Sequence, residues 1–174
     1  MSPNVTLDSA VCVLAHPGAT KQRLHRDVPP LYGTPLDRAL PCYSVGLFMP
    51  LCDIDAEIGP TGCERGSHMR ICTAEEPEPS LDWPQMNAGD CLIMDYRLRH
   101  QGGGNSSDRL RPLVVMGYAR PWYTDSVNYG IQDRLQIAPE VIDGLEDQYK
   151  GLFAKLRAVD WHDANQFKLG LDQT

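Results

Sequence analysis

The stretch NAGDCLIMDYRLRHQGGGNSSDRLRPLVVMGYA, residues 87–119, decides the fold class. An Asn-Ala-Gly-Asp turn leads into an apolar run, Cys91–Tyr96, and His100 follows almost at once. A glycine-rich loop at 102–105 then separates this run from a second one, Leu113–Ala119. Short runs rich in β-branched and aromatic residues between turn signals are typical of strands. We therefore expect two buried strands here, with His100 close to the end of the first.

The chain upstream of this stretch continues the same pattern. Strands or extended segments are expected at Ala10–His16, Gln22–Asp27 and Cys42–Leu51, with a turn at 59–62 and an acidic surface loop at Glu75–Pro84. Many short strands between Gly and Pro turns, with few helices, favour an all-β barrel or jelly roll.

The C-terminal part has a different periodicity. Apolar residues recur at helical spacing from Pro139 to Val159, and proline suits the first turn of a helix. This pattern predicts one amphipathic helix packed outside the sheet. We find no internal repeat, so we expect a single domain over 1–174, with its core at about 10–125 and its helical tail at about 139–160.

Composition excludes several classes of function. The chain has 16 Lys and Arg against 23 Asp and Glu, a net charge of −7, which disfavours nucleic-acid binding. No apolar run is long enough for a membrane span, and the N-terminus lacks the features of a secretory signal. The six cysteines are scattered without a Cys-x-x-Cys pair, so we expect reduced, mostly buried thiols in a cytoplasmic protein.

Three residues form a candidate metal site. His25 and Asp27 are two positions apart, so on an extended segment their side chains point to the same face. His100, from a distant strand end, can complete a set of two imidazoles and one carboxylate. Such a set occupies one face of an octahedral Fe(II) ion and leaves the other face for a cosubstrate and O2. The alternative is a solvated His25 with Asp27 in a surface ion pair.

Three motifs in order carry a family resemblance: QRLHRD at 22–27, GPTGCERGSH at 59–68 and the block at 87–112. Together they resemble the phytanoyl-CoA dioxygenase-like family of Fe(II)- and 2-oxoglutarate-dependent oxygenases, over about residues 10–125. The ending YARPWYTD at 118–125 looks most like the fungal secondary-metabolite branch. That branch hydroxylates, desaturates or rearranges small hydrophobic natural products such as terpenoids, meroterpenoids and alkaloids.

The resemblance implies a double-stranded β-helix, the cupin-like jelly roll, with the three candidate ligands holding Fe(II). It also implies that 2-oxoglutarate chelates the iron and that its far carboxylate pairs with Arg111. Arg109 is the alternative cation, two residues earlier. Thr61 and Gln22 match positions that contact the cosubstrate. His68 receives a structural interpretation, and Trp122 with Tyr123 is assigned to the core slightly ahead of the substrate mouth.

Family members are typically longer ahead of the His-x-Asp segment, whereas 24 residues precede His25 here. Three explanations stay open: a truncated form, a pocket wall supplied by another subunit, or an unusually open cleft. An apolar surface left by a missing layer favours association, so we expect a homodimer or a heteromer. Two other functions stay open as well. One is a non-oxidative isomerase or cyclase on the same fold, and the other is a non-catalytic partner subunit of a longer oxygenase.

Overall fold

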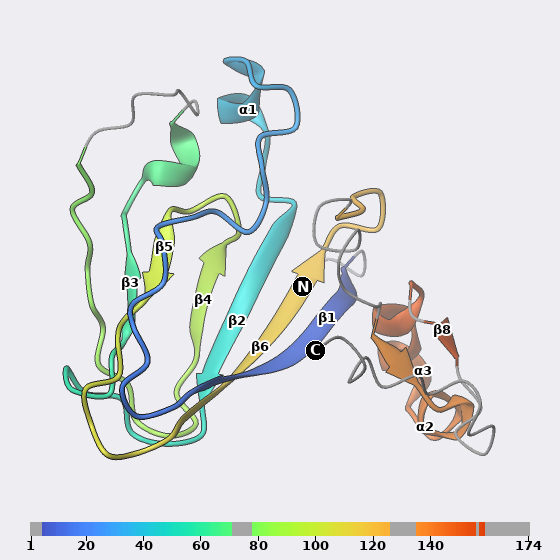
Figure 1. Cartoon of the computed structure of the whole chain (residues 1–174). Helices are drawn as coiled ribbons and strands as arrows, with labels where there is room; N and C mark the ends of the chain where they lie inside the picture. Colours follow the sequence, from blue (N-terminus) through green and yellow to red (C-terminus); the bar gives the residue numbers. More distant parts are fainter. Residues whose placement is uncertain (1–4, 71–77, 126–134, 156, 159–174) are drawn as a thin grey trace, which may run out of the picture.

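The computed structural model describes residues 5–70, 78–125, 135–155 and 157–158. Its main element is an antiparallel sheet in the order β1-β6-β2-β4 (Figure 1). The strands are β1 (Thr6–Ala15), β6 (Arg111–Ala119), β2 (Ser44–Pro50) and β4 (Leu92–Asp95). These are the four predicted strands, with ends shifted by up to four residues, whereas the predicted extended segment Gln22–Asp27 forms only an isolated bridge at His25.

A smaller layer faces this sheet. It consists of β3 (Thr61–Cys63) paired with β5 (His100–Gly102), and His25 bridges to the first residue of β5. Figure 1 shows β3 and β5 lying opposite β4 and β2. Backbone hydrogen bonds join His25 to His100 at the start of β5. Two facing antiparallel layers confirm the mainly β, jelly-roll class that the sequence predicts.

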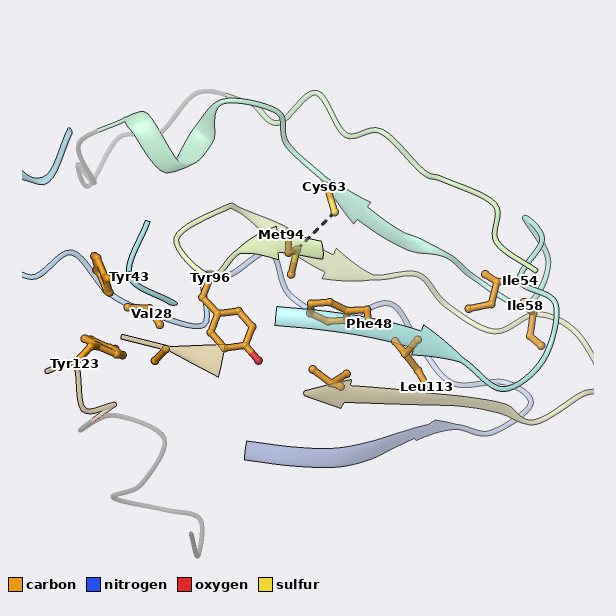
Figure 2. Close-up of a cluster of buried hydrophobic side chains, with 12 residues drawn as sticks. Val28, Tyr43, Phe48, Ile54, Ile58, Cys63, Met94, Tyr96, Leu113 and Tyr123 are labelled. Carbon is orange, nitrogen blue, oxygen red and sulfur yellow. Dashed lines mark hydrogen bonds between the residues drawn. The ribbon is translucent and has the colours of Figure 1, made fainter. Parts of the chain in front are cut away.

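The core lies between the two layers because strand periodicity buries alternate residues. Along β6 and β2 every second position is buried, starting at Arg111 and Ser44. Figure 2 shows Phe48 and Leu113 pointing from these strands into the cluster, while the Sγ of Cys63 in β3 lies 3.9 Å from the Sδ of Met94 in β4. The core therefore joins the sheets by apolar contact and leaves room for polar residues at its ends.

Two short helical elements connect the layers. Helix α1 (Leu36–Ala39) precedes β2, and the 3₁₀ turn η1 (Ser67–Met69) follows β3. The carboxylate of Asp37 accepts backbone N–H groups from Leu31, Tyr32 and Thr34, so one buried acid holds the proline-rich loop before α1.

The prediction of one C-terminal helix is wrong for the described residues. The tail forms α2 (Pro139–Asp143), α3 (Asp147–Lys150) and η3 (Gly151–Phe153), and β7 (Gln136–Ile137) pairs in parallel with β8 (Arg157–Ala158). Gly144 ends α2, and Glu146 is extended with ψ of 142° before α3 begins. Helical spacing of apolar residues was thus outweighed by a glycine and a local break in the backbone. The remainder of the predicted tail, residue 156 and residues 159–160, lies outside the described residues.

Two predictions about burial also need correction. Among the five described cysteines only Cys63 is buried, so the thiols are unpaired but not mostly buried. Cys12 is exposed because strand alternation places it on the outer side of β1, at the edge of the sheet. Tyr123 belongs to the core with 6% exposure, whereas Trp122 is 62% exposed.

In the part of the chain that the structure describes, no helix has the length and apolarity that a membrane crossing requires.

Candidate metal and cosubstrate site

His25, Asp27 and His100 come together between the two layers. His100 is the first residue of β5, and His25 forms an antiparallel bridge with it. The amide of Asp27 donates to the carbonyl of Tyr96 at 3.1 Å, which fixes the carboxylate beside the two rings. One ligand atom from each of the three residues lies within 4.8 Å of the other two. The three side chains are therefore close enough to share one ion.

Backbone carbonyls orient both imidazole rings. Nδ1 of His25 lies 2.8 Å from the carbonyl oxygen of Arg23. Nδ1 of His100 lies 3.0 Å from the carbonyl oxygen of Leu98. A carbonyl can only accept, so each Nδ1 carries a proton and each Nε2 keeps a lone pair when the ring is neutral. The Nε2 atoms face the Asp27 carboxylate at 3.4 and 3.5 Å, a donor set that fits a divalent transition metal with an open face.

The surroundings shift the two histidine pKa values in opposite directions. The hydrogen bond to Asp27 raises the pKa of His25 above its ordinary value. Burial lowers the pKa of His100, whose side chain is 4% exposed. At neutral pH His100 is therefore a neutral ligand, whereas a metal ion at His25 competes with a proton that Asp27 stabilises.

Arg111 places a guanidinium at one end of the same space. It opens β6, is 4% exposed, and donates from Nη1 to the carbonyls of Gly103, at 3.0 Å, and of Gly59. Gly59 has φ of +84°, and a Cβ there would collide with the backbone of Gly103, so glycine lets the two loops close around the arginine.

The Nε of Arg111 is buried and has no hydrogen-bond partner among the described residues. Burial lowers the pKa of Arg111, but a guanidinium stays charged at neutral pH. A buried cation with an unused N–H fits a carboxylate, which accepts parallel N–H groups from one guanidinium. The residues present therefore fit the far carboxylate of 2-oxoglutarate as well as the metal.

Thr61 and Gln22 lie at the same end of the site. Thr61 is buried in β3, and its register partner in β5 is Gly102. Gln22 accepts the amide of Gly102 through Oε1 at 2.8 Å, so its side chain is held against β5. Both residues line the pocket described below, together with Arg111.

The structure does not bring Arg109 to this site. Its side chain is 46% exposed, and Nη2 donates to the Asp55 carboxylate at 2.6 Å. Arg109 precedes β6, so strand periodicity does not place its side chain on the same face as that of Arg111. Arg109 is not among the residues that line the pocket shared by the triad and Arg111.

A pocket of about 300 Å³ joins the triad to Arg111. Apolar side chains of the large sheet line it, namely Val11, Val13, Phe48, Leu113 and Val115. Strand register puts Arg111 opposite Ala15 and Gly117 opposite Ser9, so the inner face runs about 20 Å from Arg111 to Ser9. The pocket thus has a cationic end, a metal-ligating middle and a second end with polar residues such as Ser9 and Ser44.

A buried ionic layer, made of the pairs Arg97–Asp95 and Arg99–Glu64, precedes His100 and was not predicted from the sequence. Arg97 and Arg99 are 6% and 7% exposed, although both lie within the four residues before β5. Arg97 forms a two-point ion pair with Asp95 at 2.9 and 2.6 Å, and Arg99 pairs with the buried Glu64 at 3.2 Å. The signal that could have revealed it is the Arg-Leu-Arg-His alternation, which places two cations beside a candidate ligand.

Two antiparallel layers around an open-faced His-Asp-His set define the class: a candidate mononuclear metal enzyme of the double-stranded β-helix fold. Residues 4–113 match the family model described as phytanoyl-CoA dioxygenase (PhyH). This match covers more than half of the chain, so the chain belongs to the phytanoyl-CoA dioxygenase family. The resemblance drawn from the three sequence motifs is thereby confirmed.

Curated fungal proteins are similar to this chain. Dioxygenase aneA of Aspergillus aculeatus is 30% identical over 129 residues, which are 71% of this chain and 43% of that protein. Dioxygenase hkm4 of Aspergillus hancockii is 33% identical over 115 residues, 63% of this chain and 37% of that protein. The chain therefore spans about two fifths of the length of these relatives. Among solved structures, EvdMO1 matches with a TM-score of 0.58 and 26% identity over 67% of this chain and 28% of that chain.

Proposed function

We propose that this chain carries the catalytic site of an Fe(II)- and 2-oxoglutarate-dependent oxygenase. One observation carries the proposal: a triad able to share an ion opens into the same pocket as a buried arginine with an unused N–H. His25, Asp27 and His100 would hold the iron, and Arg111, with Thr61 and Gln22 beside it, would hold the cosubstrate. Family membership and the two fungal dioxygenases support this assignment.

When bound, Fe(II) with 2-oxoglutarate reduces O2, so that a substrate C–H bond is oxidised while 2-oxoglutarate becomes succinate and CO2. The chain's own residues would position the metal and the cosubstrate and would exclude water. Arg111 would pair with the far carboxylate of the cosubstrate, and the carbonyls of Arg23 and Leu98 would keep the Nε2 atoms turned toward the metal. The apolar sheet face limits water around the oxidising site, which protects the protein from side reactions.

We propose a small, largely apolar natural product as the substrate, such as a terpenoid, a meroterpenoid or an alkaloid. Five aliphatic or aromatic side chains of the large sheet line the pocket, which suits a hydrophobic skeleton. The hydroxyl-bearing residues Ser9 and Ser44 stand at the end remote from Arg111, where they suit an oxygenated edge of such a molecule. Hydroxylation, desaturation and rearrangement all begin from the same oxidised C–H bond.

The test uses the purified chain without oxygen. Fe(II) and 2-oxoglutarate added together are expected to produce the visible charge-transfer band of a 2-oxo acid chelated to iron, and air should then release succinate. The Asp27→Ala variant should show neither. A non-oxidative isomerase or cyclase would release no succinate when a substrate is turned over. A scaffold subunit would keep the activity of its complex unchanged after Asp27→Ala.

We also propose that two copies of this chain associate. The sheet face that points away from the pocket carries apolar side chains on all four strands, among them Leu14, Leu47, Ile93 and Met116. A face of four strands by about seven residues measures roughly 450 Å². Two such faces bury close to the roughly 1,000 Å² that a specific interface needs.

Light scattering coupled to gel filtration should therefore give twice the chain mass, and Leu47→Lys should halve it. Trp122→Lys, a change on an exposed residue outside that face, is the control. A wild-type monomer at tens of micromolar would contradict the association.

A further inference from the structure

Arg26 lies between two proposed metal ligands but points to the other side of the segment. Strand alternation sends His25 and Asp27 toward the pocket and the residue between them away from it. Arg26 donates from Nε to the carbonyl of Arg97 at 3.0 Å and from Nη2 to the carbonyl of Ser67 at 3.4 Å. Its side chain therefore ties the His-x-Asp segment to the ionic layer and to η1.

Ser67 holds the other ligand segment through a different atom. It is completely buried, and its hydroxyl oxygen accepts the backbone N–H of Arg99 at 2.7 Å. Arg99 directly precedes His100. The carbonyl of Arg99 also accepts a hydrogen bond from the amide of Glu64 at 2.9 Å. One residue of η1 thus contacts both ligand-bearing segments, through its carbonyl on one side and its hydroxyl on the other.

We propose that Arg26 and Ser67 form a brace, a pair of positioning residues that, together with the backbone hydrogen bonds between His25 and His100, holds the His25–Asp27 segment at its spacing from His100. The proposal rests on the proposed metal site. Its physical basis is that ligand residues held within a few tenths of an ångström bind an ion without reorganising, so supports outside the ligand set raise affinity. Neither side chain lines the pocket, so the brace acts through the ligands and not on a substrate.

The experiment measures Co(II) binding to the metal-free chain, because Co(II) reports both affinity and coordination geometry through its visible d–d bands. Ser67→Ala removes the hydroxyl and leaves the carbonyl, and Arg26→Met removes the hydrogen bonds to the carbonyls of Arg97 and Ser67. Each variant is expected to bind Co(II) about 10- to 100-fold more weakly, with altered d–d bands. Since both act through one brace, the double variant should lose less than the product of the two losses.

Two controls separate positioning from stability. Lys21→Met changes an exposed side chain just ahead of the same segment and should leave Co(II) binding within about twofold of wild type. Ile54→Ala opens a cavity at a buried core residue remote from the brace, so it should lower the melting temperature while the folded protein binds Co(II) normally. Arg26→Lys, which keeps the charge and loses the planar fork, is expected to fold and to show an intermediate loss of affinity.

Brace variants that melt earlier but keep the wild-type Co(II) affinity and spectrum would overturn the brace and leave the metal site standing. Should Ser67→Ala fail to fold, the two Arg26 variants decide the question alone. A wild-type chain that binds no Co(II) would overturn both the brace and the metal site.

Discussion

His25 and His100 are cross-strand partners: the amide of His25 donates to the carbonyl of His100 at 3.0 Å, and the amide of His100 donates back at 2.9 Å. Their ring centroids lie 4.3 Å apart as a consequence. Two residues 75 positions apart in the chain are thus placed side by side by backbone ladder pairing. Such pre-organisation means that a metal binds the native state far better than the unfolded chain.

Metal binding should therefore stabilise the fold. At a Mn(II) concentration of 100 times its Kd, linkage adds about 2.7 kcal/mol to the free energy of unfolding. For a chain of this size, that corresponds to a rise in Tm of about 5–10 °C. Differential scanning fluorimetry with and without a chelator measures the shift. His100→Ala should abolish it, whereas His16→Ala, at an exposed residue, should retain it. A shift that survives His100→Ala would place the metal elsewhere.

Substitution of Arg111 should weaken the binding of 2-oxoglutarate, whereas substitution of Arg109 should leave it nearly unchanged. Arg111→Met removes a buried charge-assisted contact and should weaken anaerobic 2-oxoglutarate binding to the metal-loaded chain about 10- to 100-fold. Arg109→Met breaks an exposed ion pair with Asp55 and should change it less than about twofold. Titration of the charge-transfer band gives both constants. The opposite order would reverse the assignment of the two arginines.

Tyr96 packs directly against the backbone of two glycines on the inner face of the large sheet. Gly46 and Gly117 are register partners on β2 and β6. A Cβ at Gly46 would collide with the Tyr96 ring and reach 2.5 Å from Phe48, and one at Gly117 would lie 3.0 Å from the Tyr96 hydroxyl oxygen. Gly46→Ala should therefore destabilise the fold by about 1–3 kcal/mol through overpacking. Urea unfolding checks this against Gly151→Ala, where a Cβ meets open space.

Thiol reactivity should follow local environment and not exposure alone. Burial raises the pKa of Cys63 to about 11, and burial with the nearby Asp95 raises that of the exposed Cys42 to about 11. At pH 8 roughly one in a thousand of these thiols is ionised, so iodoacetamide should modify both slowly. Because the pKa values lie above this range, each rate should rise about tenfold per pH unit from 8 to 10. Peptide mass spectrometry gives the site-specific rates, and rapid labelling of Cys42 at pH 8 would contradict the prediction.

The sequence by itself determined the elements that depend on local pattern. Short apolar runs between turn signals located β2, β4 and β6, and the two-residue spacing put His25 and Asp27 on one face. Motif order added Arg111, whose burial at the start of β6 agrees with the role that the resemblance implies. These features can be predicted from the sequence because side chains in a strand point alternately to its two faces, so their direction follows from their position.

Only the tertiary structure decided which polar residues meet. The exposure of Arg109, the break of the tail at Gly144 and the contacts of Ser67 with both ligand segments have no periodic signature. Each depends on loops that bring together segments distant in the chain, with closure set by backbone hydrogen bonds and buried charges. Local pattern fixes where a side chain points along its own strand, whereas the partner it reaches is fixed only when the two layers pack.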